Sequence, residues 1–337
     1  LTDCFPALPR GDVFPVSARF SQDMKESEKG RSFMRSILKK EKTLSQNAHN
    51  NLTAYFMIFP ALLVLAIFVY APLFLAISKS MTNWSFYGTS EFIWFKNFAL
   101  ILKNQLFRVS IVNALKFVGI IVPIQLVLSF LFAHVLKSLA SRMGTFVKSS
   151  IYVPTVIAGV IASVIFIFIF DYSAGLANVI LGFFGVERQA FLADPKLALF
   201  SVCLPIIWLG FGYNSLVMFA GLINIPKEYY ESADIDGAGF FTKMIKITIP
   251  SLKNTVLLLC INLVTTTIQL FDVPYVMTGG GPLNKTITPI IYLFNSSKSN
   301  DQSMGYTLAG ALLVMIVITL VNTIVFRVIQ SDKSTDD

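Results

Sequence analysis

Residues 51–78 read NLTAYFMIFPALLVLAIFVYAPLFLAIS and contain no charged side chain. A helix that crosses the hydrocarbon core of a bilayer needs about 20 consecutive apolar residues, so this run is long enough to span a membrane. An isolated strand would leave its backbone groups unpaired in lipid, and the run lacks the alternation of a barrel strand. The run therefore predicts a transmembrane helix.

Five further runs also lack Asp, Glu, Lys and Arg, and each predicts a spanning helix. They are residues 117–136, 149–170, 197–226, 254–271 and 302–326. The run 254–271 is the shortest, and it lengthens if it takes in Asp272 and the apolar residues as far as Met277. The expected fold is thus an all-α membrane protein with six transmembrane helices.

The composition agrees with a membrane bundle and argues against a soluble enzyme or a metal protein. Of the 337 residues, 55% are hydrophobic and 14% are charged, whereas soluble domains carry about 25% charged residues. The cysteines Cys4, Cys203 and Cys260 are odd in number and scattered, which argues against a disulfide framework or a zinc site. His49 and His134 are the only histidines, too few for a histidine-based metal site.

The basic residues predict the orientation of the spans. With a cytoplasmic N-terminus, the inside segments contain 18 Lys and Arg and the outside loops contain 7. Cytoplasmic segments carry the excess of positive charge in membrane proteins, so we expect both termini inside. Residues 1–50 are expected to be a cytoplasmic tail, either partly disordered or carrying an amphipathic helix around Phe33, Met34, Ile37 and Leu38. Residues 331–337 are expected to be a second cytoplasmic tail.

The connection between the fourth and fifth runs, residues 221–252, reads GLINIPKEYYESADIDGAGFFTKMIKITIPSL. Asn224 is placed to cap a helix that begins at Pro226. Glu228 and Glu231 lie in its first turns, where the helix dipole favours acidic groups. Gly237 is placed to end it in a left-handed conformation. The pattern predicts a short helix that docks on a partner.

The same connection resembles a known family. The segment E-S-A-x-x-D-G-A from Glu231 to Ala238, followed by I-x-I-P from Ile247 to Pro250, resembles the EAA loop of permease subunits of binding-protein-dependent ABC importers. Ser232 and Ile249 are mild departures from that pattern. The segment FDVPYVMTGGGP, residues 271–282, is similar to the carbohydrate branch of the family, which includes the larger maltose permease subunit. GLAN at 175–178 and WLGF at 208–211 match as well, and the resemblance covers residues 52–330.

The resemblance implies a type I ABC importer permease fold over residues 51–330, with a cytoplasmic coupling helix in the loop 224–250. It implies a bacterial inner-membrane protein that imports a sugar together with a second homologous permease, an ATPase dimer and an extracytoplasmic solute-binding protein. The chain lacks a phosphate-binding GxxxxGK[ST] loop, so ATP and Mg belong to the ATPase partner. We expect this chain to catalyse no reaction and to bind no cofactor. The residues expected to couple to the ATPase are Glu228, Tyr230, Glu231, Ala233, Asp236, Gly237, Ala238 and Pro250.

Polar residues in the fifth run indicate where a solute passes. Asn262, Thr266 and Gln269 share one helical face, and Thr267 borders that face. Polar residues inside a span often mark a pathway. The alternative is that they form hydrogen bonds to neighbouring helices.

The fourth run carries a second polar group, Tyr213 and Asn214, beside glycine residues that permit close approach. By resemblance to the maltose permease subunit, Leu209, Gly210 and Tyr213 occupy solute-contacting positions, as do Thr155 and Thr267. The side chains at the last two positions differ from the maltose case, which leaves the solute open. A neutral oligosaccharide is our preference, with monosaccharides, sugar phosphates, polyols and acidic oligosaccharides as alternatives.

Two other classes of protein compete with the importer hypothesis. A secondary transporter needs ionisable groups within the membrane, and only Asp272 and His134 come close to meeting that need. An integral membrane enzyme would need clustered His, Asp or Glu at the membrane surface, and the sequence has no such cluster.

Overall fold

The structure, a computed structural model, describes most of the chain outside its two tails. The described residues are 54–85, 90–139, 141–299 and 303–330. The predictions for residues 1–50 and 331–337 therefore lie outside the described part. The chain divides into two compact units, Leu1–Phe74 and Leu75–Asp337, and each is described by itself.

Within the described residues, five helices are long and apolar enough to cross a membrane, and a bent helix pair supplies a sixth candidate. The five are Ala54–Ser80, Gln105–Ser138, Ala198–Ile223, Lys253–Thr278 and Met304–Gln330. Each overlaps one of the charge-free runs, so five of the predicted spans are confirmed. The fifth run does lengthen through Asp272, as expected, although one irregular turn separates its two parts.

The described part of the first unit is the beginning of the helix Ala54–Ser80, which runs on into the second unit. This helix includes a π-helical turn η1 (Ala66–Tyr70) and ends as α2 (Ala71–Ser80). The remaining helices are α3 (Lys96–Lys103), α4 (Gln105–Ser138), α5 (Ser141–Val156), α6 (Gly159–Ile169), α7 (Leu176–Phe183), α8 (Ala198–Ile223), α9 (Lys227–Ile235), α10 (Phe240–Lys243), η2 (Met244–Thr248), α11 (Ile249–Ser251), α12 (Lys253–Ile268), α13 (Asp272–Thr278), α14 (Pro289–Lys298) and α15 (Met304–Gln330).

The prediction of one continuous helix over residues 149–170 is wrong. The segments Arg142–Val156 and Gly159–Ile169 meet at an angle of 94°. Pro154 lies inside α5, and a proline removes one backbone hydrogen bond and crowds the preceding turn. The helix tightens where the Ile157 N–H donates to the Pro154 carbonyl oxygen at 3.1 Å, and Ala158 is then extended, with ψ of 139°. Because α6 packs against α13, tertiary contacts hold the bend.

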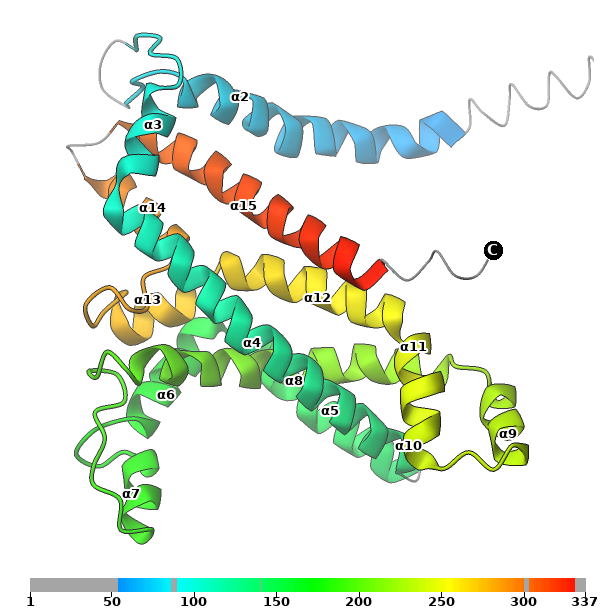
Figure 1. The fold of residues 1–337 in the computed structure, drawn as a ribbon. Coiled ribbons are helices and arrows are strands. Elements are labelled where there is room, and N and C mark those ends of the chain that lie inside the picture. The colour runs from blue at the N-terminus through cyan, green and yellow to red at the C-terminus, as the bar shows by residue number, and fades with distance from the viewer. Residues whose placement is uncertain (1–53, 86–89, 140, 300–302, 331–337) are drawn as a thin grey trace, which may run out of the picture. The chain divides into compact units, whose positions relative to one another are not determined.

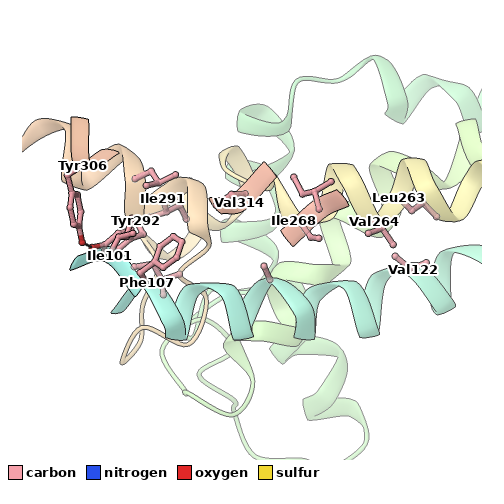
Figure 2. Close-up of a cluster of buried hydrophobic side chains, with 14 of the residues drawn as sticks. Ile101, Phe107, Val122, Leu263, Val264, Ile268, Ile291, Tyr292, Tyr306 and Val314 are labelled. Atoms are coloured by element: carbon pink, nitrogen blue, oxygen red, sulfur yellow. Dashed lines mark hydrogen bonds between the residues drawn. The ribbon is translucent and has the colours of Figure 1, made fainter. Parts of the chain in front are cut away.

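Helix α4 is the central element of the second unit, since it contributes to all three buried hydrophobic clusters. Phe107 lies in a cluster with α12, α14 and α15, which Figure 2 shows in part. Phe117 packs in a second cluster with α8 and α13. Ala133 packs in a third cluster with the C-terminal part of α8 and with Leu252, which directly precedes α12. The core therefore extends along α4 for most of its length.

The connecting elements of the second unit lie at two opposite ends. In Figure 1, α9 lies at one end, next to α10 and α11. The helices α7 and α13 and the start of α4 lie at the other end. The predicted docking helix and the glycine-rich segment 279–281 are thus separated by the length of the spans.

Candidate functional site

The short helix predicted between the fourth and fifth spans is present as α9, and its C-terminal cap is the one that the sequence predicts. Gly237 has a φ of +71°, a conformation that glycine adopts without strain. The N–H groups of Gly237 and Ala238 donate to the carbonyl oxygens of Asp234 and Ala233 at 3.1 and 2.8 Å. This pair of bonds is a Schellman motif, and it ends the helix after Ile235.

The N-terminal cap differs from the prediction. The helix begins at Lys227, the capping residue is Pro226, and no side chain caps it. Asn224 instead ends α8 in a right-handed helical conformation, with φ of −81° and ψ of −7°. An N-cap residue has an extended backbone. Asn224 has a helical backbone and ends α8, so it does not cap α9.

One face of α9 is anchored to the bundle through Tyr230. Its hydroxyl shares a hydrogen bond of 2.9 Å with the hydroxyl of Thr248, a buried residue of η2. The ammonium of Lys137, at the end of α4, lies 4.8 Å from the centre of the tyrosine ring. An ion pair between Lys243 and Asp234 makes a second link to α10. These contacts link α9 to the end of α4, to α10 and to η2.

The opposite face of α9 is exposed and has a mixed character. Glu228, Glu231 and Ile235 follow one another at three- and four-residue spacing and point away from the bundle. Ile235 is 87% exposed. Phe240 and Phe241, just beyond the cap, are also exposed. Exposed apolar side chains rimmed by charged residues mark an interaction surface, which we call the docking face.

The predicted coupling residues fall into three groups. Glu228, Glu231, Asp236 and Gly237 are exposed, whereas Tyr230, Ala233 and Ala238 are half-buried and face the bundle. Pro250 lies apart from α9, in the first turn of α11. The predicted coupling residues do not include Ile235, Phe240 and Phe241, although apolar residues in a charged loop are the signal that identifies them.

The predicted polar face of α12 is exposed in this chain. Asn262, Thr266 and Gln269 are all exposed, in line with Leu258 toward the start of the helix. The Thr266 hydroxyl donates to the Asn262 carbonyl oxygen at 3.0 Å, so its oxygen is free to accept a hydrogen bond. Thr267 is buried instead. The three exposed side chains form a polar stripe along a spanning helix.

The second predicted group comes together around the middle of α8. The Thr155 hydroxyl donates to the Leu209 carbonyl oxygen at 3.0 Å. Asn214 is buried and donates from its side-chain nitrogen to the Gly210 carbonyl oxygen at 2.8 Å. Tyr213 is 41% exposed. The structure thus leaves Tyr213 accessible and uses Thr155 and Asn214 to bond the α8 backbone.

Gln125 was not among the residues predicted for this group, whereas a close approach at its glycine residues was expected. Gln125 of α4 is buried and donates to the Ile207 carbonyl oxygen at 3.3 Å. Gly212 lies so close to α5 that an added Cβ would overlap the Ile151 carbonyl oxygen. Glycine permits such backbone contact between helices, and the WLGFGYNS segment of α8 carries the signal in its two glycines.

The sequence also singled out His134 and Asp272 as the ionisable residues in or near the spans. His134 lies against Phe130 and within 3.1 Å of the Phe130 carbonyl oxygen. Asp272 is exposed at the start of α13. Among the described residues, no group of three His, Cys, Asp or Glu is placed to hold a metal ion.

Comparisons with known proteins agree with this architecture. The family model described as "Binding-protein-dependent transport system inner membrane component" matches residues 125–331. The chain is 30% identical over 284 residues to the sulfoquinovosyl glycerol transport system permease protein SmoG of Agrobacterium fabrum, covering 84% of this chain and 92% of the relative. It is 28% identical over 276 residues to the trehalose/maltose transport system permease protein MalF of Thermococcus litoralis, covering 81% and 91%.

A solved structure shares the fold. A chain in the crystal structure of a bacterial ABC transporter involved in the import of the acidic polysaccharide alginate superposes with a TM-score of 0.72. The match covers 86% of this chain and 99% of that chain at 21% sequence identity. The chain belongs to the family of inner-membrane components of binding-protein-dependent transport systems, and it is a multi-pass permease of the ABC importer type.

Proposed function

We propose that this permease forms half of the pathway of an ATP-driven importer for a sugar or oligosaccharide, and that α9 couples it to a separate ATPase. The observation that carries the proposal is α9 itself, a capped helix that presents an exposed docking face between two spans. Relatives named as permeases for sulfoquinovosyl glycerol and for trehalose and maltose support the carbohydrate assignment.

The proposed partners are a second homologous permease, a dimer of ATPase subunits that holds ATP and Mg, and an extracytoplasmic solute-binding protein. The polar stripe Asn262, Thr266 and Gln269 supports the second permease. Polar side chains are costly against hydrocarbon, so this stripe is expected to line a water-filled pathway closed by another subunit. This chain contributes the pathway and no catalytic group.

The excess of Lys and Arg in the segments that the sequence assigns to the inside, one of which contains α9, supports cytoplasmic N- and C-termini. In this orientation the docking face meets the ATPase inside the cell. Closure of the ATPase pair on ATP would draw two such helices together and tilt the bundle about the pathway. The link from Tyr230 to Thr248 at 2.9 Å is the route by which that motion reaches α12.

The test is to disrupt the docking face without disturbing the bundle. The variants Ile235→Asp and Glu231→Lys change exposed side chains, so the permease should fold and reach the membrane as before. We expect both to lose co-purification with the ATPase subunit and to lose ATP-dependent sugar uptake. The matched control is Glu187→Lys, an exposed glutamate in the loop after α7, at the opposite end of the second unit.

Normal uptake in both docking-face variants would refute the coupling role. Uptake that survives removal of the ATPase and collapses with the proton gradient would favour a secondary transporter instead. The solute itself is best identified by thermal shift of the partner binding protein across a panel of neutral and acidic sugars.

A further inference from the structure

Three basic residues surround a pocket at the end of the second unit that is opposite to α9. Arg108 lies in the first turn of α4 and Lys116 lies about two turns further along it, and Lys285 comes from the loop between α13 and α14. The pocket has a volume of about 460 Å³, and no acidic residue lines it. Figure 1 shows the start of α4 and the loop after α13 at the same end of this unit.

The loop that carries Lys285 is fixed against α4. Asn113 is 2% exposed, and its side-chain nitrogen donates to the carbonyl oxygens of Asn284 and Ile287 at 2.7 and 3.2 Å. The Lys285 N–H donates to the Pro282 carbonyl oxygen at 2.9 Å. Because a buried side chain of α4 holds the loop backbone, the lysine is positioned beside the two basic residues of the helix.

The three positive charges have no acidic partner among the described residues. The ion pair between Lys243 and Asp234 lies at the other end of the unit. Like charges around a concave surface repel one another and attract an anion. An arginine guanidinium binds the oxygens of a phosphate in a two-point contact, and lysine ammoniums add point charges. The pocket is therefore suited to a phosphate group.

The position of the pocket along α4 indicates that its ligand is a lipid. The helix has 34 residues, so at about 1.5 Å per residue it exceeds the hydrocarbon thickness of about 30 Å. Lys116 directly precedes the charge-free run 117–136, which places it at the border of the hydrocarbon. Val112 and Leu283 also line the pocket, and they are 49% and 79% exposed. Basic and apolar groups together match a charged headgroup on an apolar body.

We propose that this pocket binds an anionic membrane phospholipid, with Arg108, Lys116 and Lys285 around the headgroup phosphate. Val112 and Leu283 then contact the glycerol and the first acyl carbons. The proposal does not depend on the transported solute or on coupling to the ATPase. In the orientation proposed above, the lipid belongs to the outer leaflet.

Native mass spectrometry of the purified full-length chain in detergent tests the proposal. The probes are phosphatidylglycerol, zwitterionic phosphatidylcholine with the same acyl chains, inorganic phosphate and galacturonate. The variants are the triple change Arg108→Gln, Lys116→Gln and Lys285→Gln, and the control Lys196→Gln, an exposed lysine outside the pocket. Because a basic residue near anionic lipid contributes about fivefold in affinity, wild type and the control should bind phosphatidylglycerol far more tightly than phosphatidylcholine.

In the triple variant we expect phosphatidylglycerol to bind no more tightly than phosphatidylcholine, while the thermal unfolding temperature stays that of wild type. An unchanged preference for phosphatidylglycerol in the triple variant would overturn the proposal. Binding of inorganic phosphate without discrimination between the lipids would assign the pocket to a free anion. Loss of galacturonate binding alone would assign it to an acidic solute, and either result would overturn the lipid site.

Discussion

Replacing Gly237 by valine tests whether the C-terminal cap of α9 is needed for coupling. The φ of Gly237 is +71°, and no atom lies within 4 Å of a Cβ added there. The direct cost of valine is therefore backbone strain alone, about 1–2 kcal/mol for a side chain in the left-handed region. A cost of this size lowers the population of the capped helix by about 5–30-fold.

The assay is recovery of the ATPase subunit with the tagged permease in detergent, followed by ATP-dependent uptake in proteoliposomes. Gly239→Val is the matched control, because Gly239 has an ordinary φ of −71° and equally open surroundings. Gly237→Asn should keep most of the ATPase, since asparagine tolerates the left-handed region. Equal recovery and equal uptake in Gly237→Val and Gly239→Val would show that coupling does not depend on the C-terminal cap of α9.

Two further substitutions test the packing and the pathway. In Gly212→Ala the new methyl group overlaps the Ile151 carbonyl oxygen of α5, so we expect a loss of about 1–3 kcal/mol in stability, seen as a lower unfolding temperature in detergent. The control Gly119→Ala, in open space on α4, should be neutral or stabilising; equal unfolding temperatures would contradict the close approach. Thr266→Val removes an exposed hydroxyl from the polar stripe and should reduce sugar uptake several-fold with the ATPase still bound. The control is Thr319→Val, because Thr319 is an exposed residue of α15 whose hydroxyl also bonds its own helix. This control should transport normally, and an equal defect in Thr266→Val and Thr319→Val would show that the stripe does not line the pathway.

The approximate positions of the five long spans were predictable from the absence of charged residues. A run such as 302–326 has no charged residue, and hydrocarbon admits such a run only as a helix. The cap at Gly237 was predictable for a similar reason, because the left-handed conformation of +71° is a local requirement that glycine meets. The N-terminal cap of α9 was not predictable from the sequence. Asn224 is equally able to end α8 or to start α9, and the packing of α8 decides between the two.

The candidate sites divide in the same way. The exposed stripe Asn262, Thr266 and Gln269 follows from helical periodicity, and the structure shows those side chains exposed. Helical periodicity does not predict that Thr267 and Asn214 are buried. A polar residue in a span can line a pathway or form a hydrogen bond to a neighbouring helix, and the sequence does not distinguish the two roles.

The amino-acid sequence alone specifies which segments are apolar enough to span a membrane and where a helix ending in a glycine cap lies between two of them. These properties depend on the solvation of charges and on the backbone preferences of single residues, which are local. The 94° turn between α5 and α6 depends on tertiary packing, because α6 packs against α13. Tertiary packing also produces the contact of Gly212 with Ile151 and the hydrogen bond from Asn113 to the loop at Asn284. Each of these joins residues far apart in the chain, and their pairing depends on how the helices pack together.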